Sequence, residues 1–347
     1  MTRHVLVSRL DGAGDVLLAG PAVRAVAASG ARVTVLAGPA GAAAARLLPG
    51  VDEVRVHAAP WVLADPPPVT EAGVLGLVAE LAGLELDEAV LLTSFHQSPL
   101  PLAMLLRLAG VPRISGASVD YAGSLLDVRL RPGEDLPEDL PEPERALAIA
   151  AAAGFAPAPG DDGRLAVTPG PVPRRLRGGD PYVVVHPGAA AAARRWPEGH
   201  HAAAVELLVA AGWRVVVTGG PGEEDLTARV AGTAGTDLGG RTGLAGLAGV
   251  LRGASAVVVG NTAAAHLAAA VGTPVVSLFA PVVPALRWRP YRVPHVLLGD
   301  QEAACAASRA RDCPVAGHPC LASVSPDDVV AAVARLTAPA TGLEVSA

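Results

Sequence analysis

The sequence contains no lysine, few aromatic residues and only three cysteines in 347 residues. All 27 basic residues are arginines, they form no long basic run, and the formal net charge is −6, which argues against a nucleic-acid partner. The cysteines, Cys305, Cys313 and Cys320, are odd in number and lie near one end of the chain. They are therefore not the disulfide framework of a secreted domain.

Long uninterrupted hydrophobic stretches are also missing. The strongest candidate, residues 202–217, is interrupted by Glu206, and no stretch reaches the roughly 18 apolar residues that a membrane span needs. The chain starts directly on a short strand pattern at Val5–Val7, without the apolar core of a signal peptide. We therefore expect a cytoplasmic protein without a transmembrane segment, and peripheral contact with a membrane stays open.

Apolar residues, many of them alanine, make up 51% of the chain, enough for two substantial cores. Short apolar segments alternate with helical patterns in both halves, which predicts an α/β fold with parallel sheets. Prolines recur from residue 132 to residue 173, which is typical of a linker. We predict two Rossmann-like domains facing a cleft. Residues 1–165 form the first, linker included, and residues 173–347 form the second, with a final helix that is free to pack back on the first.

The most informative stretch is Gly260–Pro274, which lies between two predicted strands. Asn261 and Thr262 are N-cap residue types, and the alanines after them predict a helix whose first turn presents free N–H groups. Such a helix start is suited to bind a phosphate or diphosphate. His266 follows Thr262 by four residues, so both can face the same ligand. The alternative is an ordinary βαβ turn with a core-facing histidine.

Asp15 ends the loop D-G-A-G-D, residues 11–15, which connects the first predicted strand to the first predicted helix. A dinucleotide-binding fingerprint would place its glycines here, but the second predicted strand ends at Leu36–Pro39 without the acid that binds a ribose. The Asp15 charge would also repel a diphosphate. A carboxylate at a helix start suits a base that takes a proton from a hydroxyl group. The alternative is an acid that is favoured there by the helix dipole alone.

Another predicted strand ends in His186-Pro187-Gly188, and Arg194 and Arg195 follow just before a predicted helix at Pro197. Two arginines at a helix start can clamp phosphate groups, whereas solvated surface charge is the alternative.

Two further segments carry residues of chemical interest. Glu223 follows a strand of the same half, where it can hold ribose hydroxyl groups or compensate a helix dipole. Cys305, Cys313, His318 and Cys320 include the residue types of a Cys₃His zinc site, but their spacing matches no standard site, which favours reduced structural thiols.

With these motifs, the sequence resembles glycosyltransferase family 9, the heptosyltransferase-type enzymes of the GT-B superfold, over nearly its whole length. The matching segments are Gly-Asp-Val-Leu-Leu (14–18), His-Pro-Gly to Arg-Trp-Pro (186–197), the stretch 260–274, and the late cysteine-containing segment. The resemblance implies an inverting transfer of a sugar from a nucleotide diphosphate donor, most often ADP-heptose, to an acceptor hydroxyl group. It implies neither a cofactor nor an obligatory metal.

The resemblance also assigns roles to residues. Asp15 is expected to be the general base. Apart from the resemblance, the first half is expected to determine acceptor specificity, and Gly14 and the loop residues His96 and Gln97 are its acceptor-side candidates. The alternative for His96 and Gln97 is that they are ordinary loop residues. Arg194 matches a basic residue that contacts the donor phosphate, which is Lys in some members. The expected donor-binding residues are His186, Gly188, Arg194, Arg195, Glu223, Asn261, Thr262, Ala263 and His266.

Other functions and several acceptors stay open. A nucleotide-sugar epimerase or hydrolase, or a non-catalytic nucleotide-sugar-binding protein, can share this fold. An ADP-sugar is the favoured donor, and the acceptor is a glycan, a lipid-linked molecule or a small molecule.

Overall fold

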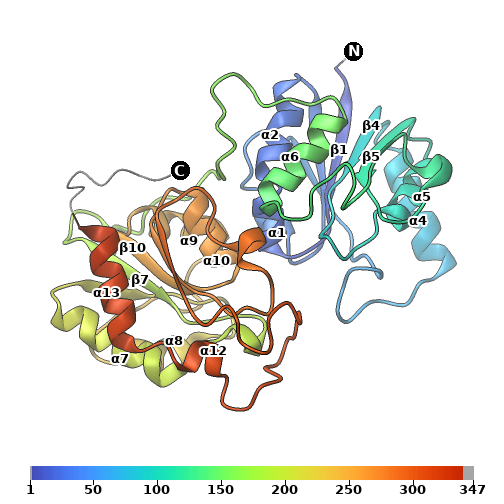
Figure 1. Ribbon diagram of the computed structural model, residues 1–347. Helices are drawn as coiled ribbons and strands as arrows, with labels where there is room; N and C mark the ends of the chain where they lie inside the picture. Colours follow the sequence, from blue (N-terminus) through green and yellow to red (C-terminus); the bar gives the residue numbers. More distant parts are fainter. Residues whose placement is uncertain (1, 339–347) are drawn as a thin grey trace. The chain divides into compact units, whose positions relative to one another are not determined.

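The computed structural model describes residues 2–338 and contains two six-stranded sheets in which all strand pairs are parallel (Figure 1). The chain divides into two compact units, Met1–Thr168 (unit 1) and Pro169–Ala347 (unit 2). The division falls inside the proline-rich segment, between the boundaries predicted at residues 165 and 173.

Unit 1 is built on one sheet with the strand order β3-β2-β1-β4-β5-β6. Its strands are β1 (His4–Arg9), β2 (Arg32–Ala37), β3 (Glu53–Val56), β4 (Glu88–Leu91), β5 (Arg113–Ala117) and β6 (Val128–Leu130). Its helices are α1 (Ala13–Leu18), α2 (Gly20–Ala28), α3 (Ala42–Ala45), α4 (Glu71–Ala82), α5 (Leu100–Leu108) and α6 (Glu142–Ala152), with a 3₁₀ turn, η1 (Gly123–Leu125).

Unit 2 repeats this plan with the strand order β12-β11-β10-β7-β8-β9. Its strands are β7 (Tyr182–His186), β8 (Arg214–Val217), β9 (Thr236–Asp237), β10 (Ala256–Gly260), β11 (Val275–Leu278) and β12 (His295–Leu298). Its helices are α7 (Glu198–Ala210), α8 (Glu224–Ala231), α9 (Leu244–Arg252), α10 (Ala263–Ala270), α11 (Ala285–Trp288), α12 (Pro319–Ala322) and α13 (Pro326–Thr337), with the 3₁₀ turns η2 (Arg174–Leu176) and η3 (Ala192–Arg194).

Both sheets are doubly wound, and this topology marks one place in each. The chain enters at a central strand, β1 or β7, builds out to one edge, and then returns to the other side of that strand with β4 or β10. Ligands of such sheets bind outside the carboxyl ends of the strands at this point of reversal. The fold therefore directs attention to the β1–β4 ends in unit 1 and to the β7–β10 ends in unit 2.

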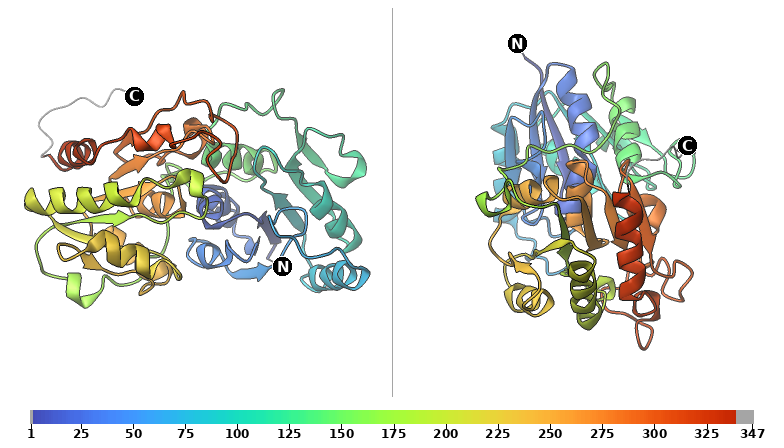
Figure 2. Two further views of the ribbon diagram at one scale, coloured as in Figure 1. Left: turned by 90° about the horizontal axis from the view of Figure 1, so that it is seen from below. Right: turned by 90° about the vertical axis from the view of Figure 1, so that its left-hand side faces the viewer.

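Helices cover both faces of each sheet, which is why the central strands are nearly continuous runs of buried apolar residues. In unit 1, α4 and α5 pack together over one face, and α2 and α6 lie side by side on the other (Figure 1). In unit 2, α7 and α13 lie side by side (Figures 1 and 2). The final helix, α13, packs on α7 and on strands β10, β11 and β12 of unit 2.

The structure differs from the elements that the sequence pattern predicts at several places, of which the following are the most informative. The single helix expected from Asp15 to Ala28 is two helices, α1 and α2, and Pro21 stands in the first turn of the second. Proline lacks an N–H group and is tolerated only at such a start, so it marks the break. The edge strands β6 and β12 were not predicted, because runs of three and four residues are too short to show a periodic pattern.

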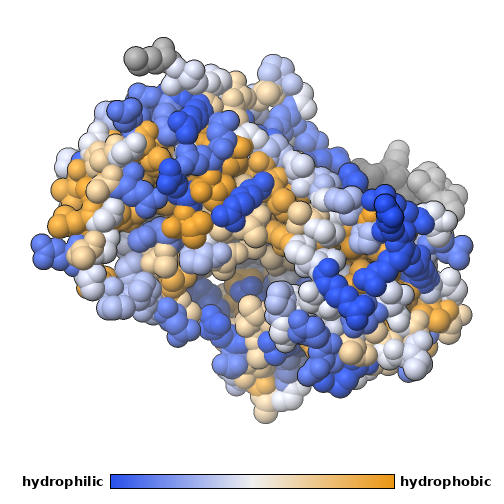
Figure 3. Space-filling model, turned by 180° about the vertical axis from the view of Figure 1, so that it is seen from behind, coloured by the Kyte–Doolittle hydropathy of each residue, from blue (hydrophilic) through white to orange (hydrophobic). Residues whose placement is uncertain are grey.

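Within residues 2–338, none of the helices combines the length and the apolar character that crossing a membrane requires. Hydrophobic residues still reach the surface, in patches broken by hydrophilic ones (Figure 3). The large exposed hydrophobic side chains of unit 1 include Leu75, Met104, Leu108, Val119 and Tyr121.

His201 in α7 makes the stability of unit 2 depend on pH. Its side chain is buried and its ring meets the Trp196 ring edge-on at a centroid distance of 4.8 Å. Burial, together with the neighbouring His186 and His200, lowers the pKa of His201 to about 3. The unfolded chain takes up this proton near pH 6.5, so the folded state binds fewer protons between these two values.

We expect the free energy of unfolding to fall as the pH drops from about 6.5 toward 3, by up to about 1.4 kcal/mol per pH unit for one histidine. His201→Phe keeps the ring against Trp196 but cannot titrate, so its unfolding free energy should fall less steeply over this range. Urea unfolding of both proteins at pH 7, 6, 5 and 4 measures the two slopes. Equal slopes would show that His201 does not carry the effect.

Candidate active site

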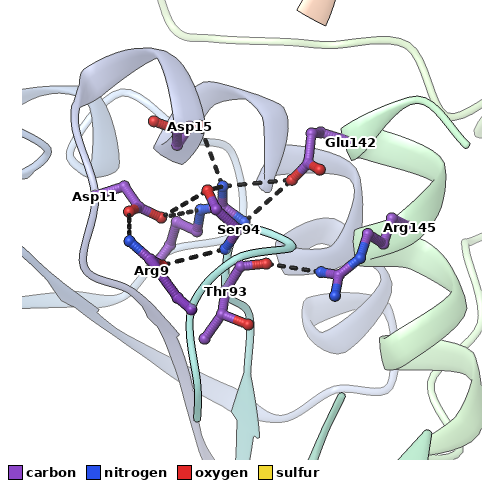
Figure 4. A network of polar contacts seen from close by, with 8 residues as sticks. Arg9, Asp11, Asp15, Thr93, Ser94, Glu142 and Arg145 are labelled. Carbon is purple, nitrogen blue, oxygen red and sulfur yellow. Dashed lines mark hydrogen bonds and ion pairs between the residues drawn. The ribbon is translucent and has the colours of Figure 1, made fainter. Parts of the chain in front are cut away.

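A buried network of charged side chains surrounds Arg9 at the carboxyl ends of β1 and β4 in unit 1 (Figure 4). Arg9 Nη2 donates to Ser94 Oγ at 2.8 Å and to Asp15 Oδ1 at 3.1 Å. Arg9 Nε lies 2.8 Å from Asp11 Oδ2. The carboxylate of Glu142, from the first turn of α6, accepts from Arg9 Nη2 at 3.4 Å. One guanidinium group thus holds three carboxylates.

The charges in this network shift two pKa values. Burial lowers the pKa of Arg9, but the surrounding carboxylates Asp11, Asp15 and Glu142 outweigh it and hold that pKa above its usual value. Burial raises the pKa of Asp11, and the negative charge of Asp15 raises it further, against the opposing effect of Arg9. Arg9 therefore stays charged, and Asp11 binds a proton more readily than an exposed aspartate does.

The predicted base lies within this network. Asp15 is the acidic residue in the first turn of α1, and its side chain is 27% exposed. The N-cap residue Gly12 offers no side chain to cap the helix, and Gly14 precedes Asp15 in the same turn. The structure thus brings Asp15 to the point of reversal in unit 1, and its role as a base stays a prediction.

Two of the three predicted acceptor-side residues, Gln97 and His96, stand in different relations to the network. Gln97 joins it directly, because its Nε2 donates to Asp11 Oδ1 while its Oε1 accepts from the backbone N–H of Ser94 at 3.2 Å. His96 is exposed and packs edge-on against Phe95, with ring centroids 5.2 Å apart. Gln97 is therefore committed to holding Asp11, whereas the His96 side chain faces solvent.

Arg9, Ser94 and Glu142 were not predicted from the sequence. An arginine at a strand end usually extends into water, and nothing in its neighbours indicates that this one is buried. A signal was present for Glu142, because E-P-E-R at residues 142–145 is typical of a helix start. The sequence pattern predicts a helix only from Glu144, within the proline-rich linker, so the prediction does not include Glu142.

In unit 2, the two segments predicted to bind a diphosphate meet at the β7–β10 ends. Arg194 closes the 3₁₀ turn η3 after β7, and its Nη1 donates to the backbone carbonyl of Asn261 at 3.4 Å. Asn261 directly precedes Thr262, the N-cap residue of α10, whose side chain makes no capping hydrogen bond. A guanidinium group therefore lies beside a helix start that no side chain caps, as an anion site requires.

The close approach of these two segments needs a glycine at position 260. A Cβ there would lie 2.9 Å from the backbone oxygen of Arg194, closer than such atoms normally come. Arg195, in contrast, is exposed and donates from Nε to Ala189 O at 2.8 Å. Its side chain thus holds the loop in shape, while that of Arg194 reaches the α10 start.

Asn261 is the only asparagine in the sequence, and its side chain serves the backbone. It is 4% exposed, its Nδ2 donates to Ala280 O at 3.2 Å, and its Oδ1 accepts from Ala280 N at 3.3 Å. The amide thereby ties the end of β10 to the residue two positions after β11. A contact between this position and a donor phosphate consequently falls to the backbone, and an aspartate here would lose the donation to Ala280.

The other predicted residues of α10 differ in exposure. Thr262 and Ala263 are half-buried at the helix start, whereas His266, one turn on, is 4% exposed. The expectation that Thr262 and His266 face one ligand stays a prediction.

Glu223 lies against the loop that follows β7. Its Oε2 accepts from the backbone N–H of Gly220 at 2.7 Å, and a Cβ on Gly188 would lie 2.1 Å from its Oε1. His186 Nδ1 and Thr218 Oγ1 are 3.0 Å apart. Burial lowers the pKa of His186, although the nearby Glu223 carboxylate opposes this shift. His186, Gly188 and Glu223 therefore form one cluster at the β7–β8 ends.

The late cysteine-containing segment supports the Arg194 turn. Ala193, directly before Arg194, donates its N–H to Arg311 O at 2.9 Å, and His318 Nε2 lies 3.1 Å from Ala193 O. The histidine considered as a zinc ligand is thus hydrogen-bonded to the loop. Among the described residues, no group of three or more His, Cys, Asp or Glu side chains is arranged to hold a metal ion.

Cys305 and Cys320 lie in the hydrophobic core beside α7 and α13, and Cys313 packs against that core. Burial, together with the adjacent Cys305 and Cys313, raises the pKa of Cys320 to about 12. All three thiols contribute to the packing of the unit 2 core.

Two doubly wound units, each with polar clusters at the carboxyl ends of its strands, define an α/β protein of the GT-B class. Comparison with known families specifies it further. The model of glycosyltransferase family 9 (heptosyltransferase) matches residues 126–318, more than half of the chain, and the protein belongs to this family.

Individual relatives agree with this assignment. Lipopolysaccharide heptosyltransferase 1 of Pseudomonas aeruginosa is 37% identical over 108 residues, which span 30% of each chain. Among solved structures, a family 9 glycosyltransferase from Veillonella parvula has a TM-score of 0.74 at 16% identity, covering 96% of this chain and 97% of its own. Escherichia coli heptosyltransferase WaaC with ADP-2-deoxy-2-fluoro heptose has a TM-score of 0.67 at 19% identity, covering 94% and 97%. The structural likeness establishes the GT-B fold.

Proposed function

We propose that this protein transfers a sugar, heptose in the first instance, from an ADP-sugar donor to an acceptor hydroxyl group, with inversion at the anomeric carbon. Family membership supports the reaction class, and WaaC with its ADP-heptose analogue supports the donor. The observation that carries the proposal is the contact of Arg194 Nη1 with Asn261 O at the start of α10. It provides a cation and uncapped N–H groups for the diphosphate.

The leaving group explains why this arrangement suits transfer. As the glycosidic bond to the donor breaks, the diphosphate gains negative charge. Arg194 and the α10 start would stabilise that charge more strongly in the transition state than in the bound donor, and this difference accelerates the reaction. Asp15 of unit 1 would take the proton from the attacking acceptor hydroxyl. We propose that the two clusters suffice without a metal ion, which activity in excess EDTA tests.

A thermal-shift screen of ADP-, UDP-, GDP- and dTDP-sugars tests the donor. ADP-heptose should stabilise the protein most, by about 2.7 kcal/mol when present at 100 times its dissociation constant. Analysis of labelled products with and without acceptor then separates transfer from hydrolysis or epimerisation. Failure of every nucleotide sugar to raise the melting temperature would contradict the proposal, and release of free sugar only, with each candidate acceptor present, would replace it with hydrolysis.

A further inference from the structure

We infer that Arg9 is a positioning residue for the transfer reaction, because it orients the Asp15 carboxylate from inside unit 1. This inference rests on the proposed role of Asp15. Arg9 touches neither donor nor acceptor in this assignment, and it acts only through the carboxylate that it holds.

The first argument is the place of Arg9 in the fold. It is the last residue of β1, its side chain is buried, and four segments contribute partners to it: the loop before α1, α1 itself, the loop after β4, and the start of α6 (Figure 4). Asp15, in contrast, is part-exposed. The buried guanidinium group of Arg9 thus fixes the part-exposed carboxylate of Asp15.

The second argument is the balance of charge. Three carboxylates, Asp11, Asp15 and Glu142, share the one guanidinium group of Arg9. The other buried arginine of the network, Arg145, donates its Nη1 to the backbone oxygen of Thr93 at 2.7 Å. The negative charge of Asp15 favours proton uptake by Asp11, and the positive charge of Arg9 opposes it.

The third argument is how Arg9 divides its contacts. Nη2 is shared among Ser94 at 2.8 Å, Asp15 at 3.1 Å and Glu142 at 3.4 Å. Asp15 therefore holds only a share of the Arg9 charge, enough to orient one oxygen, Oδ1. The charged groups around it in this network are Arg9, Asp11 and Glu142, and the charge of His96 acts on Asp11.

The test compares Arg9→Met and Arg9→Lys with wild type by the pH dependence of kcat/KM for sugar transfer. In Arg9→Met the acid limb should move to higher pH by at least about one unit, because a positive charge beside Asp15 is lost. At pH 7, kcat should fall about 100-fold from misplacement of the base, with the KM for the donor unchanged. Arg9→Lys restores the positive charge but not the planar guanidinium group. The acid limb should therefore return to its wild-type pH, while kcat recovers only in part.

Arg24→Met is the matched control, because Arg24 also pairs with a carboxylate, Asp161, in unit 1. Its pH profile should overlay that of wild type. An unmoved acid limb in Arg9→Met, or a raised donor KM with unchanged kcat, would overturn the inference. If Arg9→Met does not fold, as circular dichroism would show, an Arg9→Lys variant with wild-type kcat would overturn it equally.

A second measurement does not depend on enzyme activity. It is an NMR titration of protein labelled with ¹³C at the aspartate carboxyl groups, in which the Asp15 signal is identified as the one that is missing from Asp15→Asn. Asp15 should take up its proton at higher pH in Arg9→Met than in wild type, and at the same pH in Arg24→Met. Unchanged titration would overturn the inference. If wild type transfers no sugar, the proposed function fails alone, and this titration still decides whether Arg9 controls Asp15.

Discussion

Replacing Asp15 with asparagine should lower sugar transfer by about 1,000-fold or more while leaving the donor bound. Asparagine keeps the shape of the side chain but cannot accept a proton from the acceptor hydroxyl, and general-base catalysis contributes about 100- to 10,000-fold. The residues expected to bind the donor all lie in unit 2, so the thermal shift caused by the ADP-sugar should equal that of wild type. Rate measurements with labelled donor, together with thermal shifts, check both parts.

Asp327→Asn is the matched control for this experiment, because Asp327 is also an acid in the first turn of a helix, α13, and is exposed. It should retain wild-type transfer. Transfer at the wild-type rate in Asp15→Asn would eliminate Asp15 as the base. Loss of the thermal shift in the same variant would show instead that Asp15 contributes to donor binding.

Replacing Arg194 with methionine should lower kcat by about 100- to 1,000-fold, the usual effect of removing one group that stabilises developing negative charge. Methionine keeps much of the aliphatic length and removes the guanidinium group that donates to Asn261 O. Binding of the donor should weaken less than kcat falls, because the charge on the leaving diphosphate is greatest in the transition state. Steady-state kinetics against donor concentration separate the two effects.

Arg229→Met serves as the control for Arg194, since Arg229 is an exposed arginine of unit 2 that pairs with Glu198 at 2.6 Å. It should leave kcat and the donor KM unchanged. If Arg194→Met raises only KM, Arg194 binds ground state and transition state equally, and its proposed part in stabilising the leaving group is wrong.

The meeting of the loops after β7 and β10 was largely predictable because it depends on the order of the strands. The apolar runs Val183–Val185 and Val257–Val259 predict buried strands. Neighbouring parallel strands have their carboxyl ends at the same edge of the sheet. The loops after β7 and β10 therefore had to meet once those strands were adjacent, and Arg194 lies beside Asn261 as that reasoning predicts.

The Arg9 network was not predictable because it depends on contacts distant in sequence. Glu142 lies 133 positions from Arg9, on a helix whose neighbours are prolines that indicate a linker. Only the packing of α6 against α2 and α1 brings this carboxylate to Arg9 at the end of β1. The use of the Asn261 side chain was hidden for a similar reason. Its N-cap residue type indicates a helix start, yet its amide pairs with Ala280, two residues after the end of β11.

The Asn261 geometry also bears on how the protein ages chemically. Asparagine deamidates when the backbone nitrogen of the next residue attacks the side-chain amide, and asparagine is a thermolabile residue for this reason. Here that nitrogen, on Thr262, donates to Gly260 O at 2.8 Å, and the amide is fixed at both ends by Ala280. Both reacting groups are restrained, and the sequence has no other asparagine. On long storage, the loop before α10 should therefore keep its amide and its hydrogen bonds.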